Sequence, residues 1–394
     1  MNSGLQPMIP YGRQDISEAD IEAVVGVLRS DWLTQGPVVP RFEQAVADWT
    51  GGSFATAVSS ATAGLHIACA ALGLQAGDTL WTSPNTFVAS ANAAKYCGAA
   101  VEFIDIDPQT YNMSVECLTN RLIEAEKVGR LPKIVMPVHF AGQSCEMLAI
   151  SQLSRKYGFR VIEDASHAIG GKYRGKNVGC CEFSDAVVFS FHPVKIITTG
   201  EGGMVVTRDE QIHNRLQRLR SHGITRNPDQ MVGSSPGAWY YEQLELGWNY
   251  RMTDIQAALG ISQMGRLEEF VEKRRALSAS YEAALGGIPV VLPWQHSDTQ
   301  SSWHLYVVQL QLDRINRSRA EVFQYLRNYG IGVNVHYIPV NMQPFYQMDG
   351  SAKCATPEAF NYYQRAISLP MYAGLSGEQM EQVVRILKKA CFDV

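Results

Sequence analysis

Short apolar runs alternate with helical patterns from residue 54 to residue 207, and this alternation limits the folds open to the chain. The runs have the length of buried strands, expected at 54–58, 79–82, 100–104, 134–138, 160–163, 186–191 and 204–207. Helices are expected between them at 63–72, 87–96 and 147–157. Strands separated by helices need right-handed crossovers, which make the sheet parallel and cover both its faces. The pattern therefore predicts an α/β fold with a mostly parallel seven-stranded sheet.

The residues outside this region predict an arm and a second, smaller unit. Ser17 and Asp20 have the spacing of a capping box at a helix start, and Thr253 can cap a long helix that bridges to the C-terminal part. The elements expected here are helices over 17–28, 39–49, 253–275, 319–328 and 376–390 and strands over 305–311 and 332–336. The expected division is an N-terminal arm over 1–12, a large domain over 13–260 and a smaller C-terminal α/β domain with the bridging helix over 261–394.

Composition and charge exclude several classes of protein. With 46% hydrophobic and 18% charged residues, the 394-residue chain can bury a large core. A net charge of −4 without a Lys/Arg-rich run gives no footprint for nucleic acid or an anionic membrane. No apolar stretch approaches the roughly 20 residues of a membrane helix, and residues 1–7 lack a signal-peptide layout. Eight scattered cysteines without a C-x-x-C pair indicate reduced thiols, so we expect a soluble cytoplasmic protein.

Two charged side chains follow predicted strands of the sheet. Asp164 ends the run that begins at Val161, and Lys195 lies between the apolar run 187–191 and a glycine-rich turn at 200–203. In open α/β sheets ligands bind at the carboxyl ends of strands. Taken singly, Asp164 also fits a helix cap or surface turn, and Lys195 fits a lysine that faces water. Taken together, they are what an enzyme needs to hold pyridoxal phosphate (PLP): an aspartate for the pyridinium nitrogen and a lysine for the Schiff base.

Other residues near these strand ends suit the phosphate of such a cofactor. The run 59–64 (Ser-Ser-Ala-Thr-Ala-Gly) joins a strand to a helix N-terminus. Backbone N–H groups, the helix dipole and hydroxyls favour a phosphate there, although an ordinary N-cap has the same pattern. Ser190 is placed to donate a hydrogen bond to the phosphate. Phe87 fits the protein core as well as it fits stacking on an aromatic ring.

The histidines and glycines argue against two other kinds of site. His167 follows Glu163 and Asp164, but no second His or Cys stands at a supporting spacing, so no metal site is expected. His167 fits a polar neighbour of the cofactor or a buried residue with its hydrogen bonds satisfied. The G-x-G-x-x-G fingerprint of dinucleotide-binding enzymes is absent from the first strand–helix turn, which argues against a dehydrogenase.

Four motifs together resemble those of the DegT-type sugar aminotransferases. They are Ser-Ala-Thr at 60–62, Glu-Asp-Ala-Ser-His at 163–167, Ser-Phe-His-Pro-Val-Lys at 190–195 and Gly-Trp-Asn-Tyr-Arg-Met at 247–252. They occur in the family's order over nearly the whole chain. The family consists of fold-type I PLP enzymes that act on nucleotide-linked keto-sugars. Within it, the runs 33–36, 196–203 and 335–337 look most like the members in pseudaminic acid biosynthesis.

The resemblance implies a role for each matching residue. It makes Lys195 the Schiff-base lysine and Asp164 the pyridinium partner, both catalytic. The other residues that it places at the cofactor are Ser60, Ala61, Thr62, Phe87, His167, Ser190 and Asn249. Those that it places at the sugar nucleotide are Tyr11, Asp31, Trp32, Leu33, Thr34, Ser60, Ser190, Asn249, Asn334, Val335, His336 and Tyr337. Asn249 would reach the cofactor phosphate of the neighbouring subunit, which implies a homodimer with shared active sites.

The resemblance also implies a reaction. Glutamate would convert PLP to pyridoxamine phosphate, which would aminate C4 of a UDP-linked 4-keto-6-deoxy-N-acetylhexosamine and give UDP-4-amino-4,6-dideoxy-N-acetyl-β-L-altrosamine. An aminotransferase for another nucleotide 4-keto-6-deoxysugar, linked to dTDP or GDP, is the alternative. Lys195 argues against the relatives that dehydrate sugars with a histidine at this position. A regulatory protein on the same scaffold would need an added DNA-binding domain. Ser59, where many relatives have Asn, and Asn334, at a variable position, are departures on the sugar side.

Overall fold

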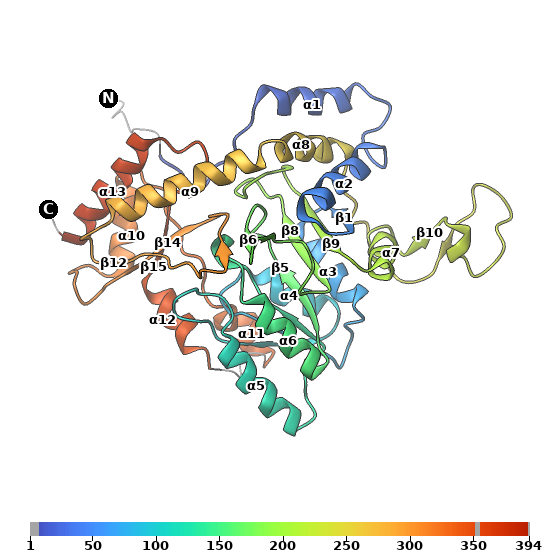
Figure 1. The fold of residues 1–394 in the computed structure, drawn as a ribbon, viewed down its shortest axis with the longest axis horizontal. Helices are drawn as coiled ribbons and strands as arrows, with labels where there is room; N and C mark the ends of the chain where they lie inside the picture. The colour runs from blue at the N-terminus through green and yellow to red at the C-terminus, as the bar shows by residue number, and fades with distance from the viewer. Residues whose placement is uncertain (1–7, 351–354, 393–394) are drawn as a thin grey trace.

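A seven-stranded sheet lies at the centre of the computed structural model, which describes residues 8–350 and 355–392 (Figure 1). Its order is β1-β9-β8-β5-β4-β2-β3. The strands are β1 (Phe54–Val58), β2 (Thr79–Thr82), β3 (Ala100–Phe103), β4 (Ile134–Met136), β5 (Arg160–Asp164), β8 (Ala186–Ser190) and β9 (Gly203–Thr207). All neighbours are parallel except that β9 runs antiparallel to β1 and β8. The prediction of a mostly parallel seven-stranded sheet is confirmed.

Helices cover both faces of this sheet, which explains why its strands are continuously apolar. Val188 and Val205 point to one face and pack with α3 (Ala61–Ala71), α4 (Val88–Tyr96) and α7 (Glu210–Leu219). Val187 and Val206 point to the other face and pack with α2 (Val38–Thr50). Farther along the sheet, α5 (Val115–Lys127) and α6 (Met147–Tyr157) cover β2, β4 and β5. Successive residues of a strand alternate between faces, so every position of β8 and β9 is buried.

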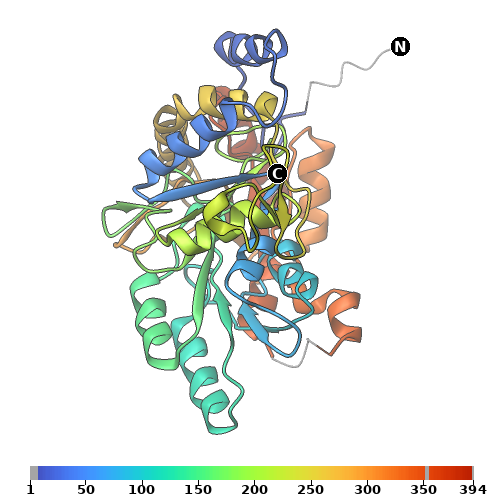
Figure 2. The same cartoon turned by 90° about the vertical axis from the view of Figure 1, so that its right-hand side faces the viewer.

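The N-terminal helix α1 (Glu18–Leu28) begins at the predicted capping box. The hydroxyl of Ser17 accepts a hydrogen bond from the Asp20 N–H, and the Asp20 carboxylate accepts one from the Ser17 N–H. The helix packs against α8 (Asp254–Met264) and stands at the top of the molecule in Figure 2. The capping pattern therefore identified this helix start correctly.

The long bridging helix predicted from Thr253 to about Arg275 is wrong as a single helix. The capping box at Thr253 is present, but α8 ends at Met264 and a separate helix, α9 (Leu267–Ala284), follows. Gly265 carries no side chain to stabilise a continued turn. Arg266, outside helical geometry, bonds to Asp15 at 2.8 Å. This ion pair to the N-terminal segment favours the break.

A second, antiparallel sheet lies beyond α9. It consists of β12 (Val290–Val291), β14 (Tyr306–Leu310) and β15 (Ala366–Leu369) and packs with α10 (Arg319–Asn328) and α13 (Gly377–Phe392). The strand predicted over 332–336 is wrong, because Asn334 makes a single bridge to Ser368 and the chain then turns away. The Asn334 side chain accepts from the Val335 N–H and so competes with a regular ladder. Its place is taken by β15, which follows α12 (Pro357–Arg365).

Short elements fill the remaining connections. A small sheet contains β6 (Lys172–Tyr173), β7 (Lys176–Asn177) and β13 (Thr299–Gln300), and α11 (Pro344–Met348) precedes the undescribed residues 351–354. The segment that carries β10 (Ile224–Thr225) and β11 (Glu242–Gln243) projects from the rest of the chain (Figure 1). We call residues 224–246 the projecting segment.

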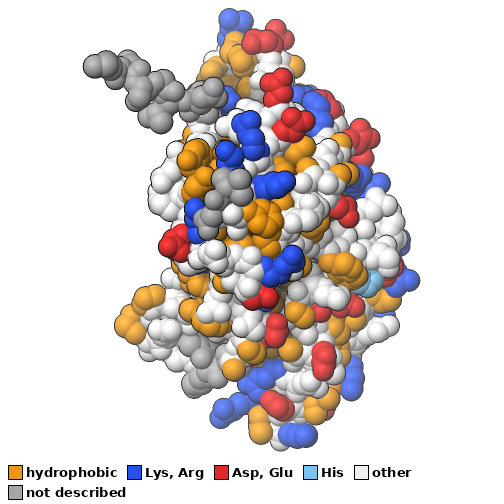
Figure 3. Space-filling view, turned by 90° about the vertical axis from the view of Figure 1, so that its left-hand side faces the viewer, with side chains coloured by type: hydrophobic (Ala, Val, Ile, Leu, Met, Phe, Trp, Pro, Cys, Tyr) orange, Lys and Arg blue, Asp and Glu red, His pale blue; other side chains and the backbone are white. Residues whose placement is uncertain are grey.

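The surface agrees with the low net charge, and the helices agree with the absence of an expected membrane span. Basic and acidic side chains are interspersed over the face that carries α13 (Figure 3). Among the helices described, none combines the length and apolar character needed to cross a bilayer. The expectations for residues 1–7 and for Cys354 lie outside the described residues. The predicted boundary between residues 260 and 261 falls inside α8, and the division into domains stays a prediction.

Candidate active site

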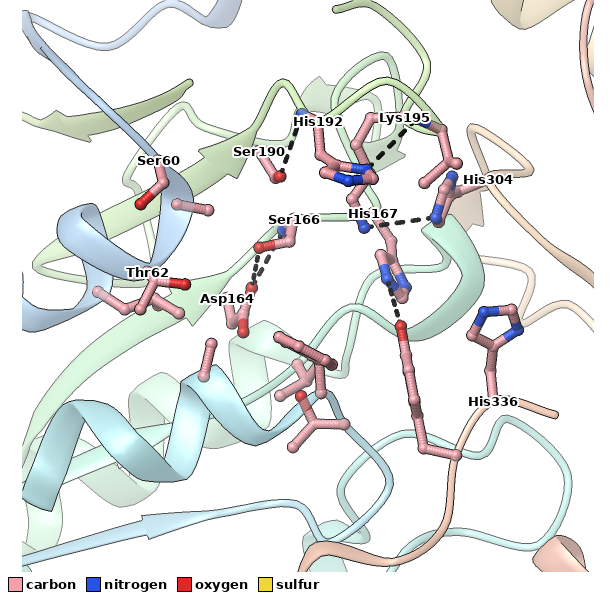
Figure 4. A pocket seen from close by; sticks show the side chains of 18 of the residues that line it. Ser60, Thr62, Asp164, Ser166, His167, Ser190, His192, Lys195, His304 and His336 are labelled. Carbon is pink, nitrogen blue, oxygen red and sulfur yellow. Dashed lines mark hydrogen bonds between the residues drawn. The ribbon is translucent and has the colours of Figure 1, made fainter. Parts of the chain in front are cut away.

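A cavity of about 760 Å³ opens where the predicted site residues meet (Figure 4). A volume of this size suits a small-molecule site. The predicted residues that line it are Tyr11, Ser60, Ala61, Thr62, Phe87, Asp164, His167, Ser190, Lys195, Asn334, Val335, His336 and Tyr337. They come from the central sheet, from the N-terminus of α3 and from the loops around the second sheet. The fold therefore brings most of the predicted set to one place.

Asp164 is the last residue of β5 and is 4% exposed. Its Oδ2 accepts a hydrogen bond from Ser90 Oγ at 2.6 Å, and its Oδ1 accepts from the N–H and the hydroxyl of Ser166 at 3.1 and 2.6 Å. A buried carboxylate is costly unless such donors satisfy it. The three donors satisfy the carboxylate and hold the side chain in the cavity wall.

Lys195 lies in the loop between β8 and β9. The loop is closed at its base by the Phe191 N–H, which donates to the Gly202 carbonyl at 2.9 Å. Part of the lysine surface remains open to the cavity, but the surrounding protein desolvates its ammonium. This burial lowers the pKa of Lys195 from 10.5 to about 8, and the nearby Asp164 carboxylate opposes the shift. At neutral pH, a larger fraction of Lys195 therefore carries a neutral amine than is the case for a surface lysine.

The N-terminus of α3 forms one end of the cavity. Ser60 is the N-cap, and its hydroxyl accepts from the Ala63 N–H at 3.2 Å. The ordinary capping role is thus real, and the hydroxyl hydrogen stays available to a ligand. The free N–H groups and dipole of this helix end favour an anion. A Cβ on Gly203 would lie 2.7 Å from the Ala61 nitrogen, so β9 supports this loop by close backbone contact.

His167 and Tyr337 form another wall. The Ala141 N–H donates to His167 Nδ1 at 3.3 Å, and His167 Nε2 lies 3.1 Å from the Tyr337 hydroxyl. With Nδ1 accepting, Nε2 carries the proton and donates to Tyr337. Burial lowers the pKa of His167, with a further contribution from Lys195. His167 therefore has both ring nitrogens hydrogen-bonded and also lies on the cavity wall. Both interpretations of this residue from the sequence, a buried residue with its hydrogen bonds satisfied and a polar neighbour of the cofactor, agree with its position.

Five predicted residues do not line this cavity. They are Asp31, Trp32, Leu33, Thr34 and Asn249. The first four are exposed in the turn after α1, and Trp32 is 55% exposed. Asn249 is exposed on a loop that bridges to Ser221. These five residues therefore do not contribute to the cavity of their own chain.

Sequence reasoning missed several polar residues of the site. Ser90, on α4, bonds to Asp164, and Ser166 lies inside a motif that was noticed for its neighbours. His304, just before β14, places its Nε2 3.4 Å from Lys195 Nζ. Ser166 could have been found as a serine two residues after the strand-end aspartate. Ser90 and His304 carry no local signal, because they meet the site only through the tertiary fold.

The sequence profile of the DegT/DnrJ/EryC1/StrS aminotransferase family matches residues 14–388. The chain belongs to this family. It is 38% identical over 368 residues (93% of each chain) to a UDP-4-amino-4,6-dideoxy-N-acetyl-beta-L-altrosamine transaminase of Campylobacter jejuni. It is also 38% identical over 383 residues (96% of each chain) to the spore coat polysaccharide biosynthesis protein SpsC of Bacillus subtilis. The protein is accordingly a sugar aminotransferase.

The fold matches solved members of the family. The structure of Helicobacter pylori PseC, an aminotransferase of pseudaminic acid biosynthesis, superposes with a TM-score of 0.90 at 29% identity and covers 98% of this chain and 100% of its own. The solved structures similar to this chain also include PLP and PMP forms of one protein. The enzymes of this family depend on PLP, and the fold is fold-type I.

The residues of the cavity fit PLP. A carboxylate with its hydrogen bonds satisfied, an amine with a lowered pKa and a helix N-terminus face the same space. These groups match the three polar parts of the cofactor, which are the ring nitrogen, the aldehyde and the phosphate. Among the described residues, no group of three or more His, Cys, Asp or Glu side chains is placed to hold a metal.

Proposed function

We propose that this enzyme aminates C4 of a UDP-linked 4-keto-6-deoxy-N-acetylhexosamine with L-glutamate as donor, in the biosynthesis of pseudaminic acid. The observation that carries the proposal is the meeting of Asp164, Lys195 and the α3 N-terminus at one cavity. The similarity to the Campylobacter transaminase and to Helicobacter PseC supports the choice of sugar. The product would be UDP-4-amino-4,6-dideoxy-N-acetyl-β-L-altrosamine.

The proposed roles follow from the geometry of the site. Ser60, Ala61, Thr62 and Ser190 would hold the phosphate end at the α3 N-terminus, and the exposed ring of Phe87 would cover the cofactor. Asp164 keeps the ring nitrogen protonated. When bound, PLP supplies an aldehyde that captures amino groups and a ring that draws electrons from the adjacent C–H bond. Lys195 attaches the cofactor, and its freed amine takes the proton from Cα of glutamate and later delivers one to C4 of the sugar.

Recognition of the substrates uses the remaining wall of the cavity. Tyr11 and Tyr337 offer hydroxyls to the sugar nucleotide, Asn334 offers an amide, and the His336 ring lies on the same wall. No arginine of the described residues lines the cavity. Arg251 likewise lies outside the lining of the cavity of its own chain.

We propose further that the enzyme works as a homodimer with shared active sites. The exposed residues Asp31–Thr34 and Asn249 would then complete the partner's cavity. The projecting segment supports this arrangement, because its side chains Val232, Trp239 and Leu246 are 89%, 74% and 77% exposed. Apolar side chains that protrude together are typical of an interface.

The proposal is tested with the purified enzyme, glutamate and a panel of nucleotide 4-keto-6-deoxysugars linked to UDP, dTDP and GDP. We expect amination of the UDP-linked N-acetylhexosamine, and no turnover by Lys195→Ala. Borohydride should fix the cofactor on Lys195, detected by mass spectrometry of the peptide. Amination of a dTDP- or GDP-linked sugar instead would establish the alternative substrate. Multiple turnovers by Lys195→Ala would refute the assignment of the lysine.

A further inference from the structure

His304 lies against the amine of Lys195 and has no part in the roles proposed above. Its Nε2 is 3.4 Å from Lys195 Nζ, and the residue is 4% exposed on the cavity wall. It precedes β14, so it reaches the site from the second sheet, whereas Lys195 and Asp164 come from the central sheet (Figure 4). The lysine amine thus lies between groups from two separate parts of the fold.

The hydrogen bonds of the neighbouring imidazoles single out His304. Both nitrogens of His167 are engaged, by the Ala141 N–H and the Tyr337 hydroxyl. Both nitrogens of His336 are also engaged, by Ser368 Oγ and by the Asn334 amide. His304 Nδ1 has no hydrogen-bond partner among the described residues. Among the described residues, the His304 ring therefore makes one polar contact, from its Nε2 to Lys195 Nζ.

The surroundings keep the His304 imidazole neutral. Burial lowers its pKa well below the usual value, and the nearby charge of Lys195 lowers it further, followed by His167, Arg274 and His336. A neutral imidazole has one nitrogen that accepts a hydrogen bond. With the proton on Nδ1, Nε2 is the acceptor and faces the lysine. His304 cannot act as a charged acid here, but it can bind an ammonium.

Arg274 fixes the position of His304. The guanidinium is 1% exposed, and its Nη1 donates to the carbonyls of Trp303, His304 and Met371 at 3.1, 3.3 and 3.0 Å. These bonds tie the backbone of His304 to α9 and to the residues after β15. The backbone that carries the imidazole is therefore held in place, as a positioning group requires.

We propose that His304 is a positioning residue for Lys195. Its neutral Nε2 accepts a hydrogen bond from the lysine ammonium whenever the amine is free, and holds Nζ where it takes up and returns protons. Within the described residues, Asp164 attracts the same charge without a hydrogen bond or ion pair to Nζ, so His304 supplies the direction. The inference rests on the proposed role of Lys195.

The test follows the attachment of PLP to the cofactor-free full-length enzyme, by absorbance, over a range of pH. The neutral amine attacks the aldehyde carbon and the aldehyde oxygen leaves as water, so the rate falls about tenfold for each pH unit below the lysine pKa. In the wild type we expect the midpoint near pH 8, from the lowered pKa of Lys195. Loss of the acceptor destabilises the ammonium, which lowers that pKa and moves the midpoint to lower pH.

Two variants separate hydrogen bonding from packing. The amide of Gln reaches roughly the position of Nε2, whereas the amide of Asn stops near Nδ1. We expect His304→Asn to move the midpoint down by about one unit and to slow the plateau rate about tenfold, since a hydrogen bond to a charged group is lost. His304→Gln should keep both values close to wild type. Should His304→Asn fold poorly, His304→Leu replaces it with the same expectation.

The control is His213→Gln, which changes a half-buried histidine on α7 outside the cavity and should leave attachment unchanged. Equal effects of Gln and Asn at 304 would show that packing matters and would overturn the proposal, as would wild-type behaviour of both. A wild-type enzyme that failed to attach PLP at Lys195 would contradict the proposed function instead. The two failures are therefore distinguishable.

Discussion

At the scale of single residues, the site depends on the buried carboxylate of Asp164, whose two oxygens both accept hydrogen bonds. Asp164 receives hydrogen bonds from Ser90 on one oxygen and from Ser166 on the other. Ser90 is fully buried and also contacts Thr86 Oγ1 at 2.7 Å. A hydroxyl in this position satisfies the anion and limits its rotation, so Ser90 contributes to both stability and orientation.

Replacement of Ser90 with Ala tests that contribution. The change leaves Asp164 Oδ2 without its protein donor in a buried site, and we expect the free energy of unfolding to fall by about 1–3 kcal/mol. Urea unfolding of the cofactor-free enzyme measures it, with an unchanged dependence on urea concentration. Ser280→Ala, which removes an exposed hydroxyl on α9, serves as control and should cost less than about 0.5 kcal/mol. Equal losses in the two variants would contradict the role of Ser90.

The residues that sequence reasoning found and those that it missed differ in how they reach the site. Asp164 and Lys195 follow strands, and the rule that ligands bind at strand ends predicts that they meet. Ser90 is 74 positions from Asp164 and His304 is 109 positions from Lys195. Their approach depends on how α4 and the second sheet pack against the central sheet. No periodicity in the sequence encodes that packing.

At the scale of elements, the prediction succeeded where local patterns decide the structure. Periodicity and caps located all seven strands of the central sheet and the starts of α1 and α8. It failed where long-range contacts decide. The ion pair between Arg266 and Asp15 accompanies the break between α8 and α9, and the bridge of Asn334 to Ser368 replaces a full strand. The strand β15, which pairs with β14, was not predicted from the sequence.

Close contact between β9 and the α3 loop leads to a prediction about Gly203. A Cβ at this position would meet backbone atoms of Ala61 and Ser60 at 2.7 and 2.8 Å, and a backbone cannot swing aside as a side chain can. We expect Gly203→Ala to displace the phosphate end of the cavity and to weaken PLP binding by about tenfold or more, measured by equilibrium titration of the cofactor-free enzyme.

The matched control for Gly203 is Gly26→Ala in α1. An added Cβ there meets no atom within 4 Å, and alanine stabilises a helix interior by roughly 0.5–1 kcal/mol relative to glycine. PLP affinity should therefore stay at the wild-type value in Gly26→Ala. A Gly203→Ala enzyme that binds PLP as tightly as this control would refute the support of the phosphate loop by β9.

At the scale of the whole molecule, one chain presents two sets of predicted site residues that do not meet. One set lines the cavity around Lys195, and the other, with Asn249 and Asp31–Thr34, is exposed. The Asn249 loop is nevertheless tied to the cavity of its own chain, because the Ser59 N–H donates to the Tyr250 carbonyl at 2.8 Å. In the proposed dimer, this loop would link the phosphate end of one site to that of the other.

Mixed dimers of Lys195→Ala and Asn249→Ala chains test whether the sites are shared. If Asn249 serves the partner's site, each dimer that contains one chain of each variant has one site in which both Lys195 and Asn249 are intact. Random reassortment of equal amounts then restores about a quarter of all sites, and amination should rise to about a quarter of the wild-type rate. If Asn249 serves its own chain, every site lacks one residue and mixing restores nothing. Separate assays of the unmixed variants, with dimer exchange verified by mass spectrometry, give the baseline against which the recovery is measured.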